Sequence, residues 1–220
     1  MKKSIYPFTV LLGLLLVATA SAQTVSPQVI LTWHANNFYP ADYEAKPLAT
    51  PNTPISVSVA VIKNSKLLDL SQATIMWYVD ENLVNPGTDP EEITFTATKS
   101  AGDAHFVRVK VITQTDSYDG SINVPVVNPQ IILPVPYENQ TVPAESTVSL
   151  QAIPYFFNVS ALQDLSFFWK VNDQDISGND NQLALQTGSS HGQTLQVNLL
   201  AQNQKNQLEY SRYRTQIIIQ

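Results

Sequence analysis

TIMWYVDEN at residues 74–82 matches SFFWKVNDQ at residues 166–174, 92 positions further along the chain. In both segments every second residue is apolar. The set is Ile75, Trp77 and Val79 in the first copy and Phe167, Trp169 and Val171 in the second. Alternation with a period of two is typical of a β-strand that buries one face. The pattern therefore predicts two equivalent strands, each with a tryptophan directed into a core.

The repeat extends to both sides of the tryptophan segments. Upstream, Val57, Val59 and Val61 match Val148, Leu150 and Ala152 at an offset of 91. Downstream, Ile93, Phe95 and Ala97 match Leu183, Leu185 and Thr187 at an offset of 90, and Val107, Val109 and Val111 match Leu195, Val197 and Leu199 at 88. The drifting offset predicts short loop deletions between corresponding strands of two copies of one domain.

The remaining sequence favours an all-β fold of two tandem β-sandwiches after a signal peptide. Turn-rich clusters such as 85–90 and 177–181 separate the apolar runs, and no segment carries a sustained helical period. We expect a signal peptide at 1–22, a first domain at 23–127 and a second at 128–220. With almost no spacer between the strand around Ile122, Val124 and Val126 and the strand at 131–133, the two domains are expected to form a stiff rod.

The N-terminus predicts export. Lys2 and Lys3 precede an apolar run from Val10 to Ala20, and Ala20-Ser21-Ala22 offers small residues for cleavage before Gln23. The run is short for a bilayer core of roughly 30 Å, so cleavage is preferred to an uncleaved anchor, and no membrane span is expected afterwards. We therefore expect a periplasmic, cell-surface or extracellular protein. The chain has no cysteine, so its cores must be held by apolar burial alone.

Composition and charge exclude several classes of protein. The 220 residues include 14 proline, 7 glycine, 18 glutamine and 16 asparagine, and the hydrophobic fraction of 44% is that of a globular chain. Loss of the leader leaves 10 basic residues against 18 acidic ones. A mildly acidic surface of this kind disfavours nucleic acid as a partner.

On these segments the chain resembles immunoglobulin-like β-sandwich modules, including the polycystic-kidney-disease-type repeats of bacterial surface proteins. Trp77 and Trp169 resemble the buried tryptophan of strand C, and 107–111 and 195–199 resemble the penultimate strand. The chain departs from antibody domains in having Val, Leu or Ala in place of the paired cysteines. The resemblance implies two Ig-like domains and carries no activity with it.

A narrower resemblance concerns LTWHA at 31–35, the Tyr-Pro loop that follows it and the segment 152–157. Together these look like uncharacterised secreted proteins of bacteria with reduced genomes, some of which are associated with type IV pilus systems. This resemblance implies an envelope or appendage protein as the partner.

Catalytic and metal-binding patterns are scarce, so we expect neither an enzyme nor a cofactor. The sequence has no phosphate-binding glycine loop and no nucleophile elbow. The histidines, His34, His105 and His191, lie far apart, and His105 occupies the place of Gln193 in the second copy, which favours a structural role. The acidic segments 173–175 and 116–120 are interpreted as turns rather than calcium loops, because each offers too few oxygen ligands.

The most unusual local feature is an aromatic loop in the first domain. Trp33, Phe38, Tyr39 and Tyr43 fall within eleven residues, and the second domain has a shorter connection at that point. Aromatic rings beside Asn36, Asn37 and Asp42 are typical of sugar-binding surfaces. The candidate ligand residues are Asn37, Tyr39, Asp42 and Tyr43. The preferred interpretation is that Trp33 faces the core, that the loop covers a sheet edge, and that 155–157 pack at the seam between domains.

Two functions remain open from the sequence. The first is a non-catalytic structural or adhesive module that contacts other proteins through edge strands and loops. The second is a carbohydrate-binding surface protein that uses the aromatic loop. A periplasmic pilus chaperone is disfavoured, because residues 23–44 contain no lysine or arginine to anchor a subunit terminus.

Overall fold

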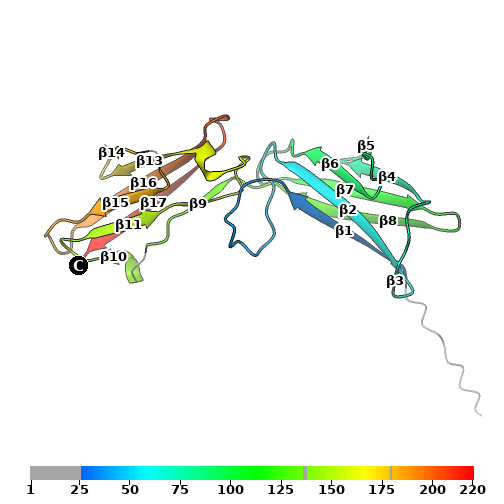
Figure 1. Ribbon diagram of the computed structural model, residues 1–220, viewed down its shortest axis with the longest axis horizontal. Coiled ribbons are helices and arrows are strands. Elements are labelled where there is room, and N and C mark those ends of the chain that lie inside the picture. Colours follow the sequence, from blue (N-terminus) through cyan, green and yellow to red (C-terminus); the bar gives the residue numbers. More distant parts are fainter. Residues whose placement is uncertain (1–25, 136–137, 179) are drawn as a thin grey trace, which may run out of the picture.

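The computed structural model describes residues 26–135, 138–178 and 180–220 and shows two β-sandwiches arranged end to end (Figure 1). The signal-peptide prediction lies outside these residues, as does Asn179 of the predicted turn cluster at 177–181. Each sandwich encloses its own hydrophobic core, one around Trp77 and one around Trp169. The boundary predicted between 127 and 128 falls between the last strand of the first sandwich and the first strand of the second.

The first sandwich consists of a β1–β2 sheet and a β4–β7–β8 sheet, each with short additional strands. On the side of β2 away from β1, β6 and β3 pair with its two ends, and the second sheet has the order β5-β4-β7-β8. The strands are β1 (Gln28–Ala35), β2 (Pro54–Lys63), β3 (Lys66–Leu67), β4 (Thr74–Val79), β5 (Asn82–Val84), β6 (Glu92–Thr96), β7 (Ala104–Ile112) and β8 (Ser117–Pro125).

The second sandwich repeats this arrangement. A five-stranded sheet has the order β10-β17-β16-β13-β14, and the facing layer consists of the pairs β9–β12 and β11–β15. The elements are β9 (Gln130–Ile132), the 3₁₀ turn η1 (Glu138–Gln140), β10 (Thr141–Val142), β11 (Thr147–Gln151), β12 (Ile153–Tyr155), η2 (Leu162–Asp164), β13 (Leu165–Val171), β14 (Gln174–Ile176), β15 (Gln182–Gln186), β16 (Thr194–Asn203) and β17 (Tyr210–Ile219). The all-β, tandem Ig-like fold predicted from the sequence is therefore confirmed.

The two tryptophan strands are built alike, as predicted. Trp77 is fully buried and Trp169 is 3% exposed. The indole N–H of Trp77 donates to the carbonyl of Pro90 at 3.0 Å, and that of Trp169 donates to the carbonyl of Asp180 at 2.9 Å. Both donors satisfy a carbonyl in the loop that leads into the next strand of the facing sheet, so each tryptophan ties its two layers together.

The turns after these strands are also equivalent. Asp80 and Glu81 in the first sandwich, and Asn172 and Asp173 in the second, have positive φ angles between 49° and 66°. Two consecutive left-handed residues are the backbone that a two-residue hairpin requires, and Asp and Asn tolerate it best. The turns join β4 to β5 and β13 to β14.

The register corrects part of the sequence alignment. Val79 pairs with Val107, and Val171 pairs with Val197, so Val107 corresponds to Val197 at an offset of 90 rather than to Leu195 at 88. Likewise Ile55 opposes Phe95 and Val148 opposes Leu185, and Phe95 matches Leu185. Ile55 and Val148 are therefore equivalent, and the offset between these two strands is 93 rather than 91. The predicted equivalence of His105 and Gln193 is therefore wrong, and Leu195 holds the place of His105.

A further correction concerns the acidic segment 116–120, which was predicted to be a turn. Only Asp116 lies in a turn, where its N–H donates to the hydroxyl of Thr113. Asp119 and Gly120 are inside β8. The carboxylate of Asp116 pairs with Lys63 at 2.8 Å, which explains its position without a metal ion.

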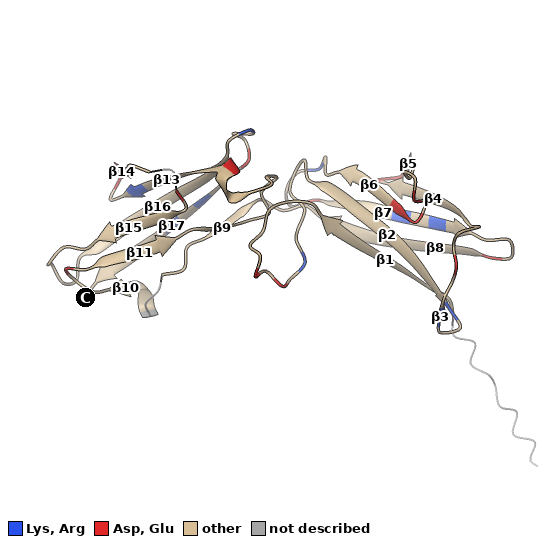
Figure 2. Ribbon diagram, viewed as in Figure 1, with Lys and Arg blue, Asp and Glu red and all other residues tan. Residues whose placement is uncertain are grey.

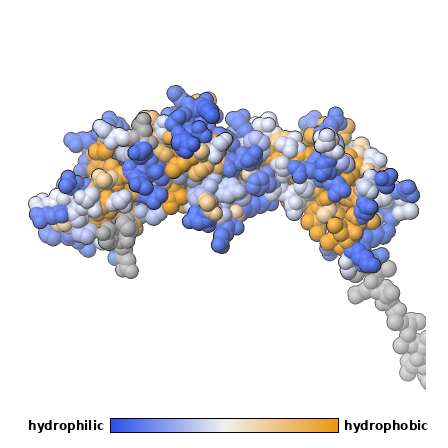
Figure 3. Space-filling model, viewed as in Figure 1, coloured by the Kyte–Doolittle hydropathy of each residue, from blue (hydrophilic) through white to orange (hydrophobic). Residues whose placement is uncertain are grey.

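Some apolar side chains remain on the surface of each sandwich. Figure 3 shows apolar surface over β1 and β2 near β3, where Ile30 and Leu67 are exposed. In the second sandwich the long strands of the five-stranded sheet expose Phe168, Tyr210 and Ile218. The C-terminal strand that carries Ile218 is paired within the chain, with β16 on one side and β10 on the other.

Replacement of Gly120 by Ala is expected to destabilise the first sandwich by about 1–3 kcal/mol. β8 and β1 approach each other at the edge of the sandwich, and a Cβ at Gly120 would lie 2.5 Å from Cγ1 of Val29. Denaturant unfolding measures the effect. Gly87→Ala is the control, because nothing lies within 4 Å of a Cβ there, and it should change the free energy of unfolding little. Equal costs for the two changes would contradict the steric explanation.

Candidate functional site

The aromatic loop between β1 and β2 reaches the second sandwich instead of forming an isolated surface. In Figure 1 it extends from the junction of the two sandwiches. The N–H of Phe38 donates to the carbonyl of Phe157 at 2.7 Å, and the N–H of Phe156 donates to the carbonyl of Phe38 at 2.6 Å. This isolated antiparallel bridge pairs backbone from the two sandwiches. The predicted packing of 155–157 at the seam is confirmed, since Phe156 and Phe157 are 3% and 0% exposed.

Trp33 faces the core, as preferred from the sequence. It is 9% exposed, opposes Val57 in the neighbouring strand and packs in the first core. The ammonium of Lys46 lies 4.0 Å from the centre of its ring, which is cation–π geometry. Burial lowers the pKa of Lys46 below its ordinary value. Trp33 is consequently covered by the loop and is not part of a ligand surface.

The four candidate ligand residues are only partly gathered. Asn37 and Tyr39 line a groove beside the seam, whereas Tyr43, whose ring centre is 5.9 Å from that of Tyr39, packs against Tyr155 and Phe156 at 5.4 and 5.6 Å. Asp42 is exposed in the middle of the loop. The structure therefore brings two of the predicted residues together at one groove and places Tyr43 in the contact between sandwiches.

The groove has a volume of about 660 Å³ and is formed by both sandwiches. Its lining consists of Asn36, Asn37, Phe38, Tyr39, Asn52, Pro54, Asn158, Val159 and Ser160. The side-chain N–H of Asn37 donates to the carbonyl of Leu48 at 2.7 Å. Its Oδ1 is buried and has no hydrogen-bond partner among the described residues. A groove lined by asparagine side chains and an aromatic ring is suited to a ligand that forms hydrogen bonds and stacks on a ring.

Asn158 connects the two sandwiches, although it belongs to no periodic pattern or motif in the sequence. Its Oδ1 accepts from the hydroxyl of Thr53 at 2.6 Å, and its Nδ2 donates to the carbonyl of Pro51 at 2.8 Å. Thr53 is fully buried, as is Thr50, whose hydroxyl donates to the carbonyl of Phe156 at 3.0 Å. These contacts, together with the Phe38–Phe157 bridge, are called the interdomain clasp below.

The clasp is supported from inside the second sandwich by Glu209. This carboxylate is 7% exposed and accepts the backbone N–H of Asn158 at 2.7 Å and the side-chain N–H of Asn203 at 2.6 Å. Charge-assisted hydrogen bonds of this kind are stronger than neutral ones. Asn158 is thereby fixed from both sides, and the orientation of the second sandwich is coupled to the loop of the first.

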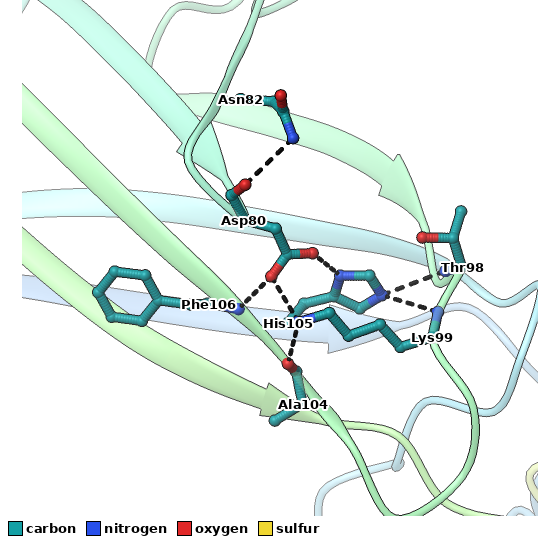
Figure 4. Close-up of polar contacts among 7 residues, drawn as sticks. All are labelled: Asp80, Asn82, Thr98, Lys99, Ala104, His105 and Phe106. Carbon is teal, nitrogen blue, oxygen red and sulfur yellow. Dashed lines mark hydrogen bonds and ion pairs between the residues drawn. The ribbon is translucent and has the colours of Figure 1, made fainter.

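The most polar buried cluster of the first sandwich surrounds His105. Figure 4 shows this imidazole between the Asp80 carboxylate and two backbone amides. His105 Nδ1 lies 2.6 Å from Asp80 Oδ2, while Nε2 accepts the N–H groups of Thr98 and Lys99 at 3.1 and 3.4 Å. A ring nitrogen that already accepts backbone amides cannot act as a general base, and the imidazole is only 1% exposed. His105 has the structural role that was expected, but it follows from these contacts and not from the equivalence with Gln193.

No family model matches the chain, and no curated protein matches it. The solved structures similar to it include the three N-terminal domains of the bacteriophage RB49 Highly Immunogenic Outer Capsid protein, at 13% identity over 88% of this chain and 59% of that one, with a TM-score of 0.47. The fibronectin(III)-like modules of Clostridium thermocellum CbhA (13% identity, 87% of this chain and 94% of that one, TM-score 0.30) and titin Ig tandem domains A164-A165 (12%, 89% and 99%, 0.26) are others. Identities this low concern the fold alone, and the strand order already defines that fold as Ig-like.

Other predicted or conceivable sites are not assembled in the described part of the chain. There, no three His, Asp or Glu side chains gather in a way that could hold a metal ion. The helical turns at 138–140 and 162–164 are far shorter than a membrane span, and no described helix is long and apolar enough for one. Val124 and Val126 are buried in the first core, so the last strand of the first sandwich is used internally rather than offered to a subunit.

Asp80→Asn is expected to destabilise the first sandwich by about 2 kcal/mol at neutral pH. Desolvation by burial raises the pKa of Asp80, but hydrogen bonds from Lys99, the Phe106 N–H and His105 outweigh it, and the pKa lies below its ordinary value of 3.8. A depressed folded-state pKa contributes stability above pH 3.8 that is lost as the pH falls through that pKa. The gap in unfolding free energy between wild type and Asp80→Asn should therefore be constant from pH 7 to about 5 and shrink below about 4.

Chemical denaturation at a series of pH values measures this gap. Asp42→Asn, which neutralises an exposed loop carboxylate, is the matched control and should stay within about 0.5 kcal/mol of wild type at pH 7. A gap for Asp80→Asn that widened on acidification would show that the sign of the linkage is wrong.

Proposed function

We propose that this chain is an exported, non-catalytic binding module in which two Ig-like domains, 23–127 and 128–220, act as one stiff unit at the bacterial envelope. The observation that carries the proposal is the interdomain clasp. Backbone pairing between Phe38 and Phe157, and a side-chain network centred on Asn158, restrict the hinge that a short linker would otherwise allow. A stiff unit of this kind holds sheet faces and loops at a fixed separation, which suits a structural or adhesive role.

The partner is an envelope or appendage protein, and the sequence resemblance to pilus-associated secreted proteins favours an appendage. The leader sequence supports export, and the acidic mature chain supports a protein rather than a nucleic-acid partner. The outer sheet faces and the free sheet edges supply the contact surface.

Cross-linking on intact cells of the producing organism, followed by mass spectrometry, tests this function. Recovery of the same envelope or appendage protein in replicate experiments, and its absence when the leader is deleted, is the expected result. Recovery of the chain only in the cytoplasm, with its leader intact, would overturn the proposal. Small-angle scattering tests the stiff unit separately, since a broad spread of interdomain distances would contradict it.

The groove beside the seam supports a second candidate function, carbohydrate binding. Tyr39 offers a ring for stacking, and the exposed side chains of Asn36 and Asn52 offer amide groups to sugar hydroxyls. On a glycan array, Tyr39→Ala should abolish retention, whereas Tyr78→Ala, on a sheet face of the first sandwich, should not. Tyr43→Ala is unsuitable as a test, because that ring packs at the seam. Absence of retention for the wild-type protein would remove this candidate.

A further inference from the structure

The outer face of the five-stranded sheet in the second sandwich combines apolar and basic side chains. Two cross-strand rows run over β13, β16 and β17. The first row is Phe168, Leu200 and Arg212, and the second is Lys170, Asn198 and Arg214. Figure 2 shows the basic positions in blue on β13 and β17. This surface, defined by these six residues, is called the basic face below.

A groove of about 410 Å³ lies on the basic face. Phe168 is 44% exposed there, although the residues before and after it, Phe167 and Trp169, are buried in the core. Phe168 and its cross-strand neighbour Leu200 together line the groove, and contiguous apolar surface with a polar rim marks interaction sites.

The charges on this face differ from those of the rest of the domain. Residues 128–220 contain four basic side chains, and three of them, Lys170, Arg212 and Arg214, lie on the basic face, with Lys205 the exception. Lys170 pairs with Asp175 at 3.1 Å. Among the ion pairs of the described residues, none involves Arg212 or Arg214. Within the described part of the chain these two exposed arginines therefore have no carboxylate partner, although Arg212 lies 5.0 Å from the centre of the Tyr210 ring.

The spacing of these arginines defines the ligand that they fit. Arg212 and Arg214 are two residues apart on one strand and project from the same face, which separates their Cα atoms by roughly 6.6 Å. An extended peptide repeats its side chains at the same interval, so carboxylates two residues apart match the two guanidinium groups. Each pair can form bidentate hydrogen bonds, and an apolar residue nearby can cover Phe168 and Leu200.

We propose that the basic face binds an extended acidic segment of a partner protein, with two carboxylates at alternate positions held by Arg212 and Arg214 and an apolar side chain placed over Phe168. This inference rests on the proposed function and names the surface and the partner chemistry that the function would use. Charge complementarity selects the segment, and the apolar groove fixes its position.

Fluorescence anisotropy with a labelled peptide Leu-Ser-Glu-Ser-Glu, whose leucine and two glutamates share one face of an extended chain, tests the proposal at low and moderate salt. We expect saturable binding of this peptide to the full mature chain, with an affinity that decreases as salt is added. The affinity should fall at least tenfold in the double variant Arg212→Glu/Arg214→Glu. Phe168→Ser should also weaken binding, but with the salt dependence retained. The peptide Leu-Ser-Lys-Ser-Lys should not bind. Lys205→Glu is the control, because it makes the same charge change at a site outside the basic face. Its affinity for the peptide should stay within about twofold of that of wild type.

Melting temperatures establish that each variant is folded. Equal binding of the lysine peptide, or binding unchanged by the double arginine reversal in a folded protein, would overturn the inference. Cross-linking on cells separates this result from the proposed function. If the same envelope protein is captured by wild type and by the folded double variant, the basic face is not the contact surface, while the proposed function stands.

Discussion

Asn158→Ala is expected to release the two sandwiches from their fixed orientation and to lower the free energy of unfolding by about 2–4 kcal/mol. The change removes the two hydrogen bonds that the Asn158 side chain forms across the seam and leaves Thr50 Oγ1, at 2.9 Å, as the remaining side-chain partner of the fully buried Thr53 hydroxyl. Loss of two hydrogen bonds and of the packed amide at a buried seam accounts for a cost of this size. Small-angle scattering should show a wider distribution of interdomain distances, and denaturant unfolding should give the change in stability.

Asn181→Ala is the matched control for this prediction. Its side-chain amide donates to the carbonyl of Ala152 at 3.1 Å, which is a contact within the second sandwich. We expect this variant to lose stability without any change in the distribution of interdomain distances. If Asn158→Ala kept the wild-type scattering profile, the Phe38–Phe157 bridge alone would be sufficient to hold the orientation, and the role assigned to Asn158 would be wrong.

The aromatic loop shows how one segment can appear from sequence to be a ligand site and be used mainly for packing. Tyr43 lies with Tyr155 and Phe156, and its hydroxyl donates to the carbonyl of Lys46 at 3.3 Å. Aromatic side chains bury large apolar areas, so contact between domains is their usual role. The ligand-site interpretation still applies to the groove, because Tyr39 and Asn37 line it after the rest of the loop has packed.

The strands and their buried faces were predictable from sequence because the period-two pattern is strong around Trp77 and Trp169. The register between copies was not, because a shift of two residues leaves an alternating pattern unchanged. That ambiguity produced the offset of 88 for Val107 and the wrong counterpart of His105. Only the hydrogen-bonded pairing of Val79 with Val107, and of Val171 with Val197, resolves it.

The contacts between the sandwiches were less accessible to sequence reasoning. Asn158 and Glu209 are separated by 51 positions, and neither belongs to a periodic or spaced motif. Polar residues at a seam depend on how two folded units meet, which no local pattern encodes.

Trp77→Ala and Trp169→Ala are each expected to destabilise one sandwich by about 3–5 kcal/mol. Each change opens a large cavity between the two sheets and removes the indole donor from the carbonyl of Pro90 or Asp180. The losses should be separable, because each tryptophan packs in a core that shares no residue with the other. Hydrogen exchange should show β4 and β7 losing protection in Trp77→Ala, and β13 and β16 losing protection in Trp169→Ala.

Each substitution serves as the control for the other, since both remove the same side chain from equivalent strands. The sandwich that keeps its tryptophan should retain protection in its central strands, with any loss limited to residues of the interdomain clasp. Trp33→Ala provides a further comparison: this side chain is 9% exposed, is covered by a loop and should cost less than Trp77→Ala. If either Trp77→Ala or Trp169→Ala abolished protection throughout both sandwiches, the chain would fold as one cooperative unit, and the clasp would contribute to folding as well as to orientation.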